Sequence, residues 1–115
     1  MTVLLILNTL GAAASVVFAV IGGLRPAALS DSGTPTAGER FHGLMYAVRG
    51  VPLGLAAAVV PLLWPGPACT SLLLAAAAAQ LGDAAIGLTH RKWTMIAGAS
   101  LLTVLHGTTA LLTSV

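Results

Sequence analysis

The chain has 115 residues, of which 57% are hydrophobic and 7% are charged, with a formal net charge of +2 and a mean hydropathy of +0.99. Soluble domains carry about 25% charged residues, so this composition excludes a protein with a fully water-exposed surface. The five basic residues form no cluster that would neutralise several phosphates, which excludes nucleic acid as a partner. The length suits one domain, residues 1–115.

Four apolar segments are long enough to cross a bilayer as helices, for which about 20 residues are needed. They cover about residues 3–22, 41–64, 67–89 and 93–112. The first link is long and rich in Gly, Pro, Ser and Thr, the second is a short Pro-Gly-Pro turn, and the third is a basic corner. The sequence therefore predicts an all-α fold, an integral membrane four-helix bundle.

Basic residues outside the four segments indicate the orientation. Arg25 and Arg40 lie in the first link, and Arg91 and Lys92 lie in the third. Two crossings separate these links, so both emerge on one side, which the positive-inside rule predicts to be cytoplasmic. We therefore expect a multi-pass protein of the bacterial cytoplasmic membrane with both termini on the non-cytoplasmic side.

Polar side chains recur at helical spacing at the start of the second segment. Glu39, His42, Tyr46 and Arg49 follow one another at intervals of 3, 4 and 3 positions, so they share one helix face. Thr36 and Glu39 have the spacing of a capping box before this helix. Because polar groups are costly in a bilayer, we expect this face to point into the bundle.

The third segment shows the same organisation, with Gln80, Asp83, Gly87 and His90 on one face. At a rise of about 1.5 Å per residue, Arg49 and Asp83 lie at matching depths of roughly 13 Å and 12 Å from the basic side. An unpaired charge there costs at least about 2.5–3.5 kcal/mol, so we expect the two to form an ion pair. The pair either fixes the helix register alone or belongs to a functional site.

Two further polar residues come from the outer segments. His106 lies roughly 21 Å from the basic side, and Asn8 reaches a similar depth, so the two can share a hydrogen bond. That bond is either purely structural or holds a proton-carrying histidine at the far end of a polar pocket. The single cysteine, Cys69, has neither a disulfide partner nor metal-ligand spacing, so no metal and no other cofactor is expected.

Three short motifs carry a resemblance to a known family: RGVPLGL at residues 49–55, LGDAAIGLTH at residues 81–90, and HG at residues 106–107. Over about residues 39–110 the chain resembles the small four-helix membrane proteins of domain of unknown function 4267, and its general build is similar to DoxX-like proteins. The resemblance implies a four-helix bundle with Arg49, Asp83 and either His90 or His106 at recurrent polar positions. It implies no activity.

These residues favour a polar pocket inside the bundle that carries out acid–base chemistry. The expected reaction is of the epoxide hydrolase, cyclase or isomerase type, on a lipophilic small molecule. Asp83 would act as the base, held by Arg49, while Tyr46 donates to the substrate oxygen, as in the Asp–Arg arrangement of small epoxide hydrolases by analogy of site alone. The candidate catalytic residues are Asp83, Arg49, Tyr46, His42 and Glu39, and the candidate substrate-binding residues are Gln80, His106 and Asn8.

Two other functions fit the same sequence. A proton-coupled small-molecule transporter would use an intramembrane carboxylate, but it favours an unpaired acid among aromatic residues, and aromatics make up only 4% of this chain. An accessory or scaffold protein would bind a partner through Gly/Ala helix faces. Beside the lipid bilayer and the small molecule, a further copy of the chain is therefore a candidate partner.

Overall fold

The computed structural model describes residues 1–25 and 34–114. Within these residues the chain forms four helices and is all-α: α1 (Thr2–Leu24), α2 (Ala37–Leu63), α3 (Pro67–Thr89) and α4 (Trp93–Thr113). Each helix is long and apolar enough to cross a membrane. The prediction of four apolar helices is therefore confirmed, and the bounds expected for the third helix are those observed.

The second helix begins at Ala37, four residues before the expected start at residue 41. A capping box accounts for the earlier start: Thr36 Oγ1 accepts a hydrogen bond from the Glu39 backbone N–H, and Glu39 Oε2 accepts one from the Thr36 N–H, both at 3.1 Å. These two bonds satisfy backbone donors that a helix N-terminus leaves without partners. The first turn of α2 is therefore polar, and it carries Glu39 as a cap.

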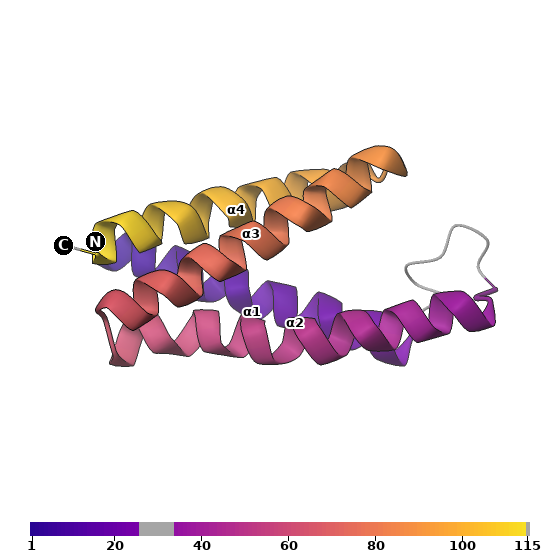
Figure 1. Ribbon diagram of the computed structural model, residues 1–115, viewed down its shortest axis with the longest axis horizontal. Coiled ribbons are helices and arrows are strands. Elements are labelled where there is room, and N and C mark those ends of the chain that lie inside the picture. Colours follow the sequence, from indigo (N-terminus) through magenta and orange to yellow (C-terminus); the bar gives the residue numbers. More distant parts are fainter. Residues whose placement is uncertain (26–33, 115) are drawn as a thin grey trace.

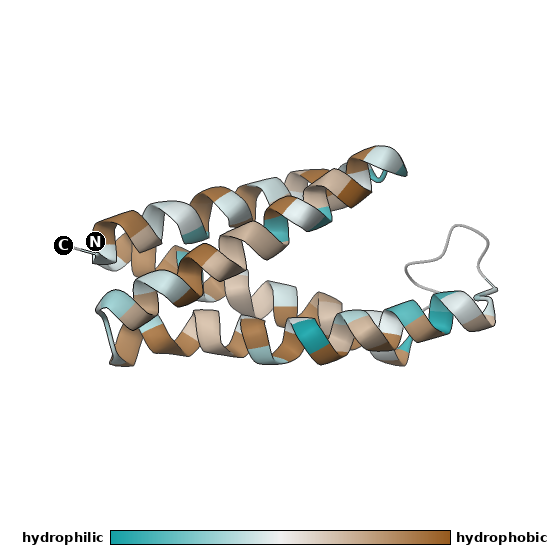
Figure 2. Ribbon diagram, in the orientation of Figure 1, coloured by the Kyte–Doolittle hydropathy of each residue, from teal (hydrophilic) through white to brown (hydrophobic). Residues whose placement is uncertain are grey.

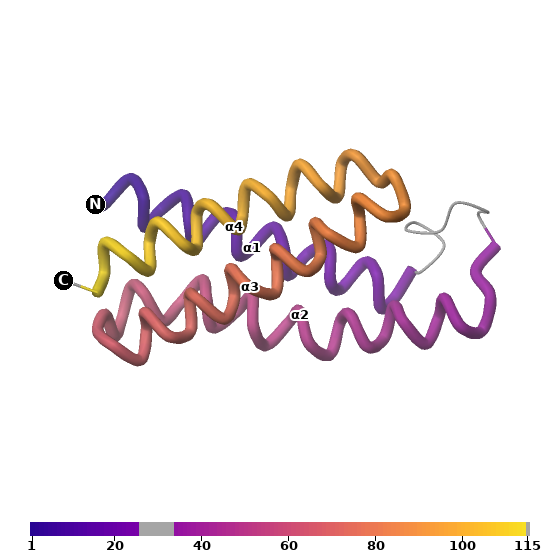
Figure 3. The backbone as a smooth tube through the Cα atoms, turned by 45° about the horizontal axis from the view of Figure 1, so that its top comes forward, coloured from indigo at the N-terminus to yellow at the C-terminus, as the bar shows by residue number. Residues whose placement is uncertain are grey.

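The helices form two antiparallel hairpins, α1 with α2 and α3 with α4, which pack more extensively within each hairpin than between hairpins. Figures 1 and 3 show the hairpins meeting at the end that holds both chain termini and diverging toward the opposite end. The first turns of α2 extend furthest in that direction (Figure 1). The molecule is 47 Å long, which is long enough to cross a hydrocarbon core of about 30 Å and the headgroup regions.

Small residues fill the core, and large apolar residues cover the outside. The buried cluster consists of Ala12, Ala57, Ala58, Cys69, Leu73, Ala76 and Ala110. Large side chains such as Val3, Val48 and Leu111 are between 68% and 75% exposed. Hydrophobic residues line all four helices, and the most hydrophilic ones lie midway along α2 and toward the end away from the termini (Figure 2). Such a surface suits lipid, and small core residues allow close helix packing.

Glycines allow α1 and α2 to approach each other closely. A Cβ at Gly54 would lie 2.6 Å from Val16 Cγ2 and 3.3 Å from the Ala12 carbonyl oxygen. A Cβ at Gly50 would lie 2.9 Å from the Cβ of Ala19. The separations of 2.6 Å and 2.9 Å are shorter than Cβ contacts allow, so the backbone of α2 can lie this close to α1 only because both positions lack a side chain.

Gly54→Ala is therefore expected to destabilise the protein by about 1–3 kcal/mol, as overpacking does elsewhere. Gly82→Ala is the matched control on α3, because a Cβ there would meet no atom within 4 Å. Alanine is the better helix former by about 1 kcal/mol, so this variant should be neutral or slightly stabilised. Thermal unfolding in detergent, followed by circular dichroism, measures both; equal stability of the two variants would contradict the close α1–α2 approach.

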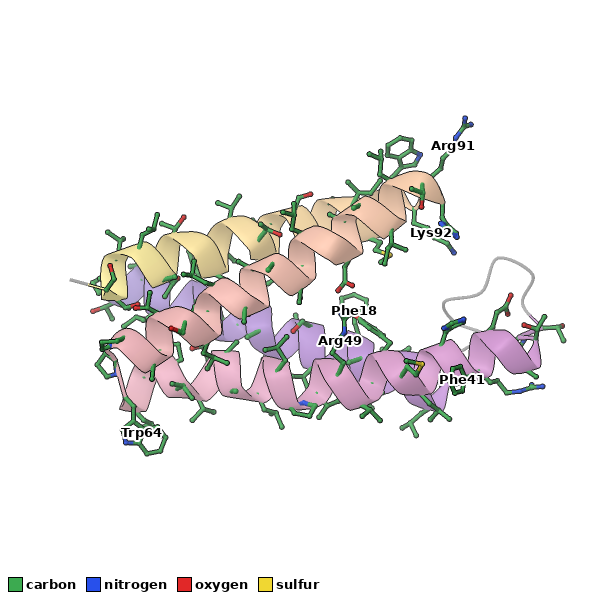
Figure 4. All side chains as sticks on the ribbon, viewed as in Figure 1. Phe18, Phe41, Arg49, Trp64, Arg91 and Lys92 are labelled. Atoms are coloured by element: carbon green, nitrogen blue, oxygen red, sulfur yellow. The ribbon has the colours of Figure 1, made fainter. Side chains whose placement is uncertain are left out.

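The basic residues at the helix ends share one end of the molecule, opposite the termini: Arg25 follows α1, Arg40 lies in the first turn of α2, and Arg91 and Lys92 connect α3 to α4 (Figures 1 and 4). Which side of a membrane this end faces stays a prediction. We expect a reporter fused to the C-terminus to be non-cytoplasmic and one inserted between residues 30 and 36 to be cytoplasmic. A cytoplasmic signal from the C-terminal fusion would contradict the predicted orientation.

Candidate functional site

Arg49 on α2 and Asp83 on α3 form an ion pair between the two hairpins. Arg49 Nη2 donates to Asp83 Oδ1 at 2.9 Å. The Asp83 side chain is 12% exposed and that of Arg49 is 48% exposed. Figure 4 shows Arg49 pointing into the space between the hairpins, near where they begin to diverge. The ion pair expected from the matching depths of these residues is confirmed.

Tyr46 lies beside this pair, one helical turn before Arg49. The guanidinium carbon of Arg49 is 5.8 Å from the centroid of the Tyr46 ring, within the range of a cation–π contact. The Tyr46 ring also lies close to Gly50, because a Cβ added at Gly50 would be 3.9 Å from Tyr46 Cε1. The phenol and the guanidinium therefore form one polar group with the Asp83 carboxylate.

All four helices contribute to a polar pocket around the ion pair. Its cavity volume is about 20 Å³, and a water molecule needs roughly 10–15 Å³ of such space, so the cavity has room for one water. The polar lining residues are Ser15 of α1, Tyr46 and Arg49 of α2, Gln80 and Asp83 of α3, and His106 of α4. Gly50, Leu53, Gly54, Ala57, Ala76 and Ala79 complete the wall.

A hydrogen-bonded chain holds His106 at the deep side of this pocket. His106 Nδ1 lies 2.7 Å from Asn8 Oδ1, and Asn8 Nδ2 donates to the Ala57 carbonyl oxygen at 2.9 Å. That carbonyl is available because Pro61, four residues later in α2, has no N–H to donate to it. Both polar side chains are buried, with exposures of 0% for Asn8 and 2% for His106. The predicted hydrogen bond between Asn8 and His106 is confirmed.

Glu39 and His42 do not line the pocket, although the sequence suggested that they form its mouth. Glu39 is exposed and caps α2 with Thr36, while His42 is exposed with its ring centroid 5.7 Å from that of Phe41. The hairpins diverge at this level, so the first turns of α2 have no opposing helix to close a pocket (Figure 1). His90 is also exposed and lies at the C-terminus of α3, outside the pocket.

Sequence reasoning left Ser15 and the small wall residues out of the site. Ser15 Oγ donates to the Ala12 carbonyl oxygen at 2.7 Å, a local bond common in apolar helices. Its place in the pocket depends on Gly54, where a Cβ would lie 3.1 Å from Ser15 Oγ. A pairing of Ser15 with a glycine on another helix has no signal in a single sequence.

The described residues contain no group of three or more His, Cys, Asp or Glu side chains that could hold a metal ion. What the pocket offers is a carboxylate, a guanidinium, a phenol, an amide and an imidazole around a volume of one water. Those groups can donate and accept protons within a low-dielectric interior.

Comparison with protein-family models gave no match, and searches of curated proteins and of solved structures found no similar protein. The resemblance to domain of unknown function 4267 and to DoxX-like proteins therefore stays a prediction. The case for a function rests on the residues of the pocket.

Proposed function

We propose that this chain is a multi-pass protein of the bacterial cytoplasmic membrane that performs acid–base chemistry on a lipophilic small molecule. The observation that carries the proposal is the convergence of ionisable side chains from three helices on one small polar cavity: Arg49 from α2, Asp83 from α3 and His106 from α4. A pair that only locked two helices together would need neither the cavity nor the additional groups around it. Intramembrane ionisable residues mark functional sites in general.

The exposed surface supports insertion into a bilayer. Trp64 at the C-terminal end of α2 and Trp93 at the start of α4 lie at opposite ends of the bundle, with exposures of 67% and 66%. Tryptophans favour the two membrane–water interfaces, and basic residues favour the cytoplasmic one. Arg91 and Lys92 lie at the end of the molecule away from the termini (Figure 4). The lipid bilayer is thus the first partner of the chain.

Three of the polar groups in the pocket take part directly in this chemistry. Asp83 is the base, and its carboxylate is oriented by the 2.9 Å hydrogen bond from Arg49. Tyr46 donates its phenolic proton to the oxygen on which charge develops, and Arg49 stabilises that charge. The cavity itself admits only a water-sized group, so the apolar body of a substrate would lie outside it, on the side where the Arg49 side chain is 48% exposed. Lipophilic epoxides fit this arrangement, and their opening leads to hydrolysis, cyclisation or isomerisation.

The accessory-protein function has one observation in its favour. Gly98 and Gly107 on α4 would accept a Cβ without meeting any atom within 4 Å. Small open faces of this kind allow another membrane helix to pack closely, so a homo-oligomer through α4 belongs to the proposal as well. The ion-paired state of Asp83 disfavours the transporter function, which needs a carboxylate that exchanges a proton for a cation.

Substrate conversion distinguishes the enzyme from the accessory protein. The purified protein in lipid nanodiscs is incubated with a panel of lipophilic epoxides, both straight-chain and cyclic, and substrate loss is followed by mass spectrometry. We expect the protein to consume at least one epoxide faster than empty nanodiscs do. If every epoxide persists as it does in empty nanodiscs, the acid–base function is wrong and the accessory function is the better proposal.

A further inference from the structure

The hydrogen bonds of Asn8 determine which ring nitrogen of His106 carries the proton. Asn8 Nδ2 must face the Ala57 carbonyl oxygen, 2.9 Å away, because a flipped amide would bring two carbonyl oxygens together. Asn8 Oδ1 therefore faces His106 Nδ1, 2.7 Å away, and can only accept. It follows that Nδ1 of His106 donates. In the neutral ring Nε2 then carries the lone pair.

The lone pair of His106 Nε2 borders the pocket. In the described part of the chain, each fully buried side-chain nitrogen or oxygen has a hydrogen-bond partner. Among these described residues Nε2 has no hydrogen-bond partner, so it is not sealed in the core, and His106 is one of the residues that line the cavity. Nε2 is therefore the ring nitrogen available to the cavity, which Asp83 also lines.

We propose that this cavity binds one water molecule, held by His106 Nε2 and the Asp83 carboxylate, and that Asn8 is the positioning residue that keeps Nε2 free to accept. The volume of about 20 Å³ suits a single water. A water has two hydrogens to donate, and the pocket presents these two acceptors, with Gln80 as a further polar neighbour. Buried waters make about three such hydrogen bonds.

This inference rests on the proposed function and specifies its reaction as addition of water to a lipophilic epoxide. The water oxygen attacks a ring carbon, forming a C–O bond, while the ring C–O bond breaks and its electron pair moves to the ring oxygen. That oxygen takes a proton from Tyr46, and the attacking water loses a proton to Asp83. Return of that proton from Asp83 to the Tyr46 phenolate restores the site, and the product is a diol.

The test is ¹⁵N nuclear magnetic resonance of histidine-labelled protein in lipid bilayers. The chain has three histidines, so His42→Gln and His90→Gln together leave His106 as the single labelled ring. We expect a pyrrole-type Nδ1, a pyridine-type Nε2 and magnetisation transfer from water to the ring. A pyrrole-type Nε2 would overturn the assigned tautomer, and no transfer from water would overturn the water site.

Asn8→Leu removes the acceptor, so we expect the ring signals to move toward the Nε2–H tautomer. Thr9→Val is the matched control, because Thr9 Oγ1 makes the neighbouring bond from α1 to α2, to the Ala58 carbonyl oxygen at 3.0 Å, without touching His106. It should leave the tautomer unchanged. If both variants shift the ring equally, Asn8 has no positioning role. The wild-type spectrum decides the tautomer even if Asn8→Leu does not fold.

Epoxide consumption that takes up no water would overturn the inference and leave the proposed function intact.

Discussion

Replacing Arg49 with Leu is expected to destabilise the bundle by about 2–4 kcal/mol, because the change strands the Asp83 carboxylate inside it. Asp83→Leu should cost less. The Arg49 side chain is 48% exposed, against 12% for Asp83, so a stranded guanidinium can turn toward the polar interface. The double variant should recover much of the loss, because no charge then remains buried.

A double-mutant cycle measures this coupling directly. Denaturant unfolding in mixed micelles gives the free energy of unfolding of the wild type, both single variants and the double variant. A coupling energy of about 1–3 kcal/mol between the two positions is the expected result. Effects that simply add would mean that the ion pair contributes nothing, and the case for a built polar site would fail with it.

Asp83→Asn is expected to slow epoxide consumption by about 10²-fold or more, the usual effect of removing a general base. The amide keeps the size of the side chain, so the loss would reflect chemistry rather than packing. Glu39→Gln and His42→Gln should change the rate by less than about threefold, because neither residue lines the pocket. The rate of epoxide consumption is measured in nanodiscs for all three variants.

These three variants also show where the chemistry takes place. Glu39 and His42 belong to the helix face predicted from the sequence, whereas Asp83 belongs to the pocket of the structure. A large loss in Glu39→Gln with Asp83→Asn still active would place the chemistry at the start of α2. The pocket around Asp83 would then be structural only.

Much of the fold follows from the sequence because membrane helices are specified by length and apolarity alone. The Arg49–Asp83 pair was predictable for a related reason. Two opposite charges at one depth have few other ways to avoid an unpaired state in lipid. Matching depth also predicted the hydrogen bond between Asn8 and His106. The structure contains this hydrogen bond and the Arg49–Asp83 ion pair.

The pocket boundary was not predictable, because helical spacing defines a face without stating what opposes it. Glu39, His42 and Tyr46 share a face with Arg49, but the hairpins diverge from near Arg49 toward the start of α2 (Figure 4), and Glu39 and His42 are exposed. That divergence depends on the packing of whole hairpins, which no local pattern reports. Asn8 is oriented by the Ala57 carbonyl oxygen, which is available because Pro61 has no N–H to donate to it. The sequence contains Pro61, but its effect on Asn8 follows only once α1 and α2 are known to be in contact.

Epoxide conversion in ¹⁸O-labelled water, with the protein in nanodiscs, tests the proposed chemistry most directly. We expect a diol that carries one ¹⁸O atom, formed by the wild type and at least about 10²-fold more slowly by Asp83→Asn. A product without the label would keep the enzyme but remove the water from its mechanism. No Asp83-dependent conversion of any lipophilic epoxide would contradict the central claim that this pocket performs acid–base chemistry.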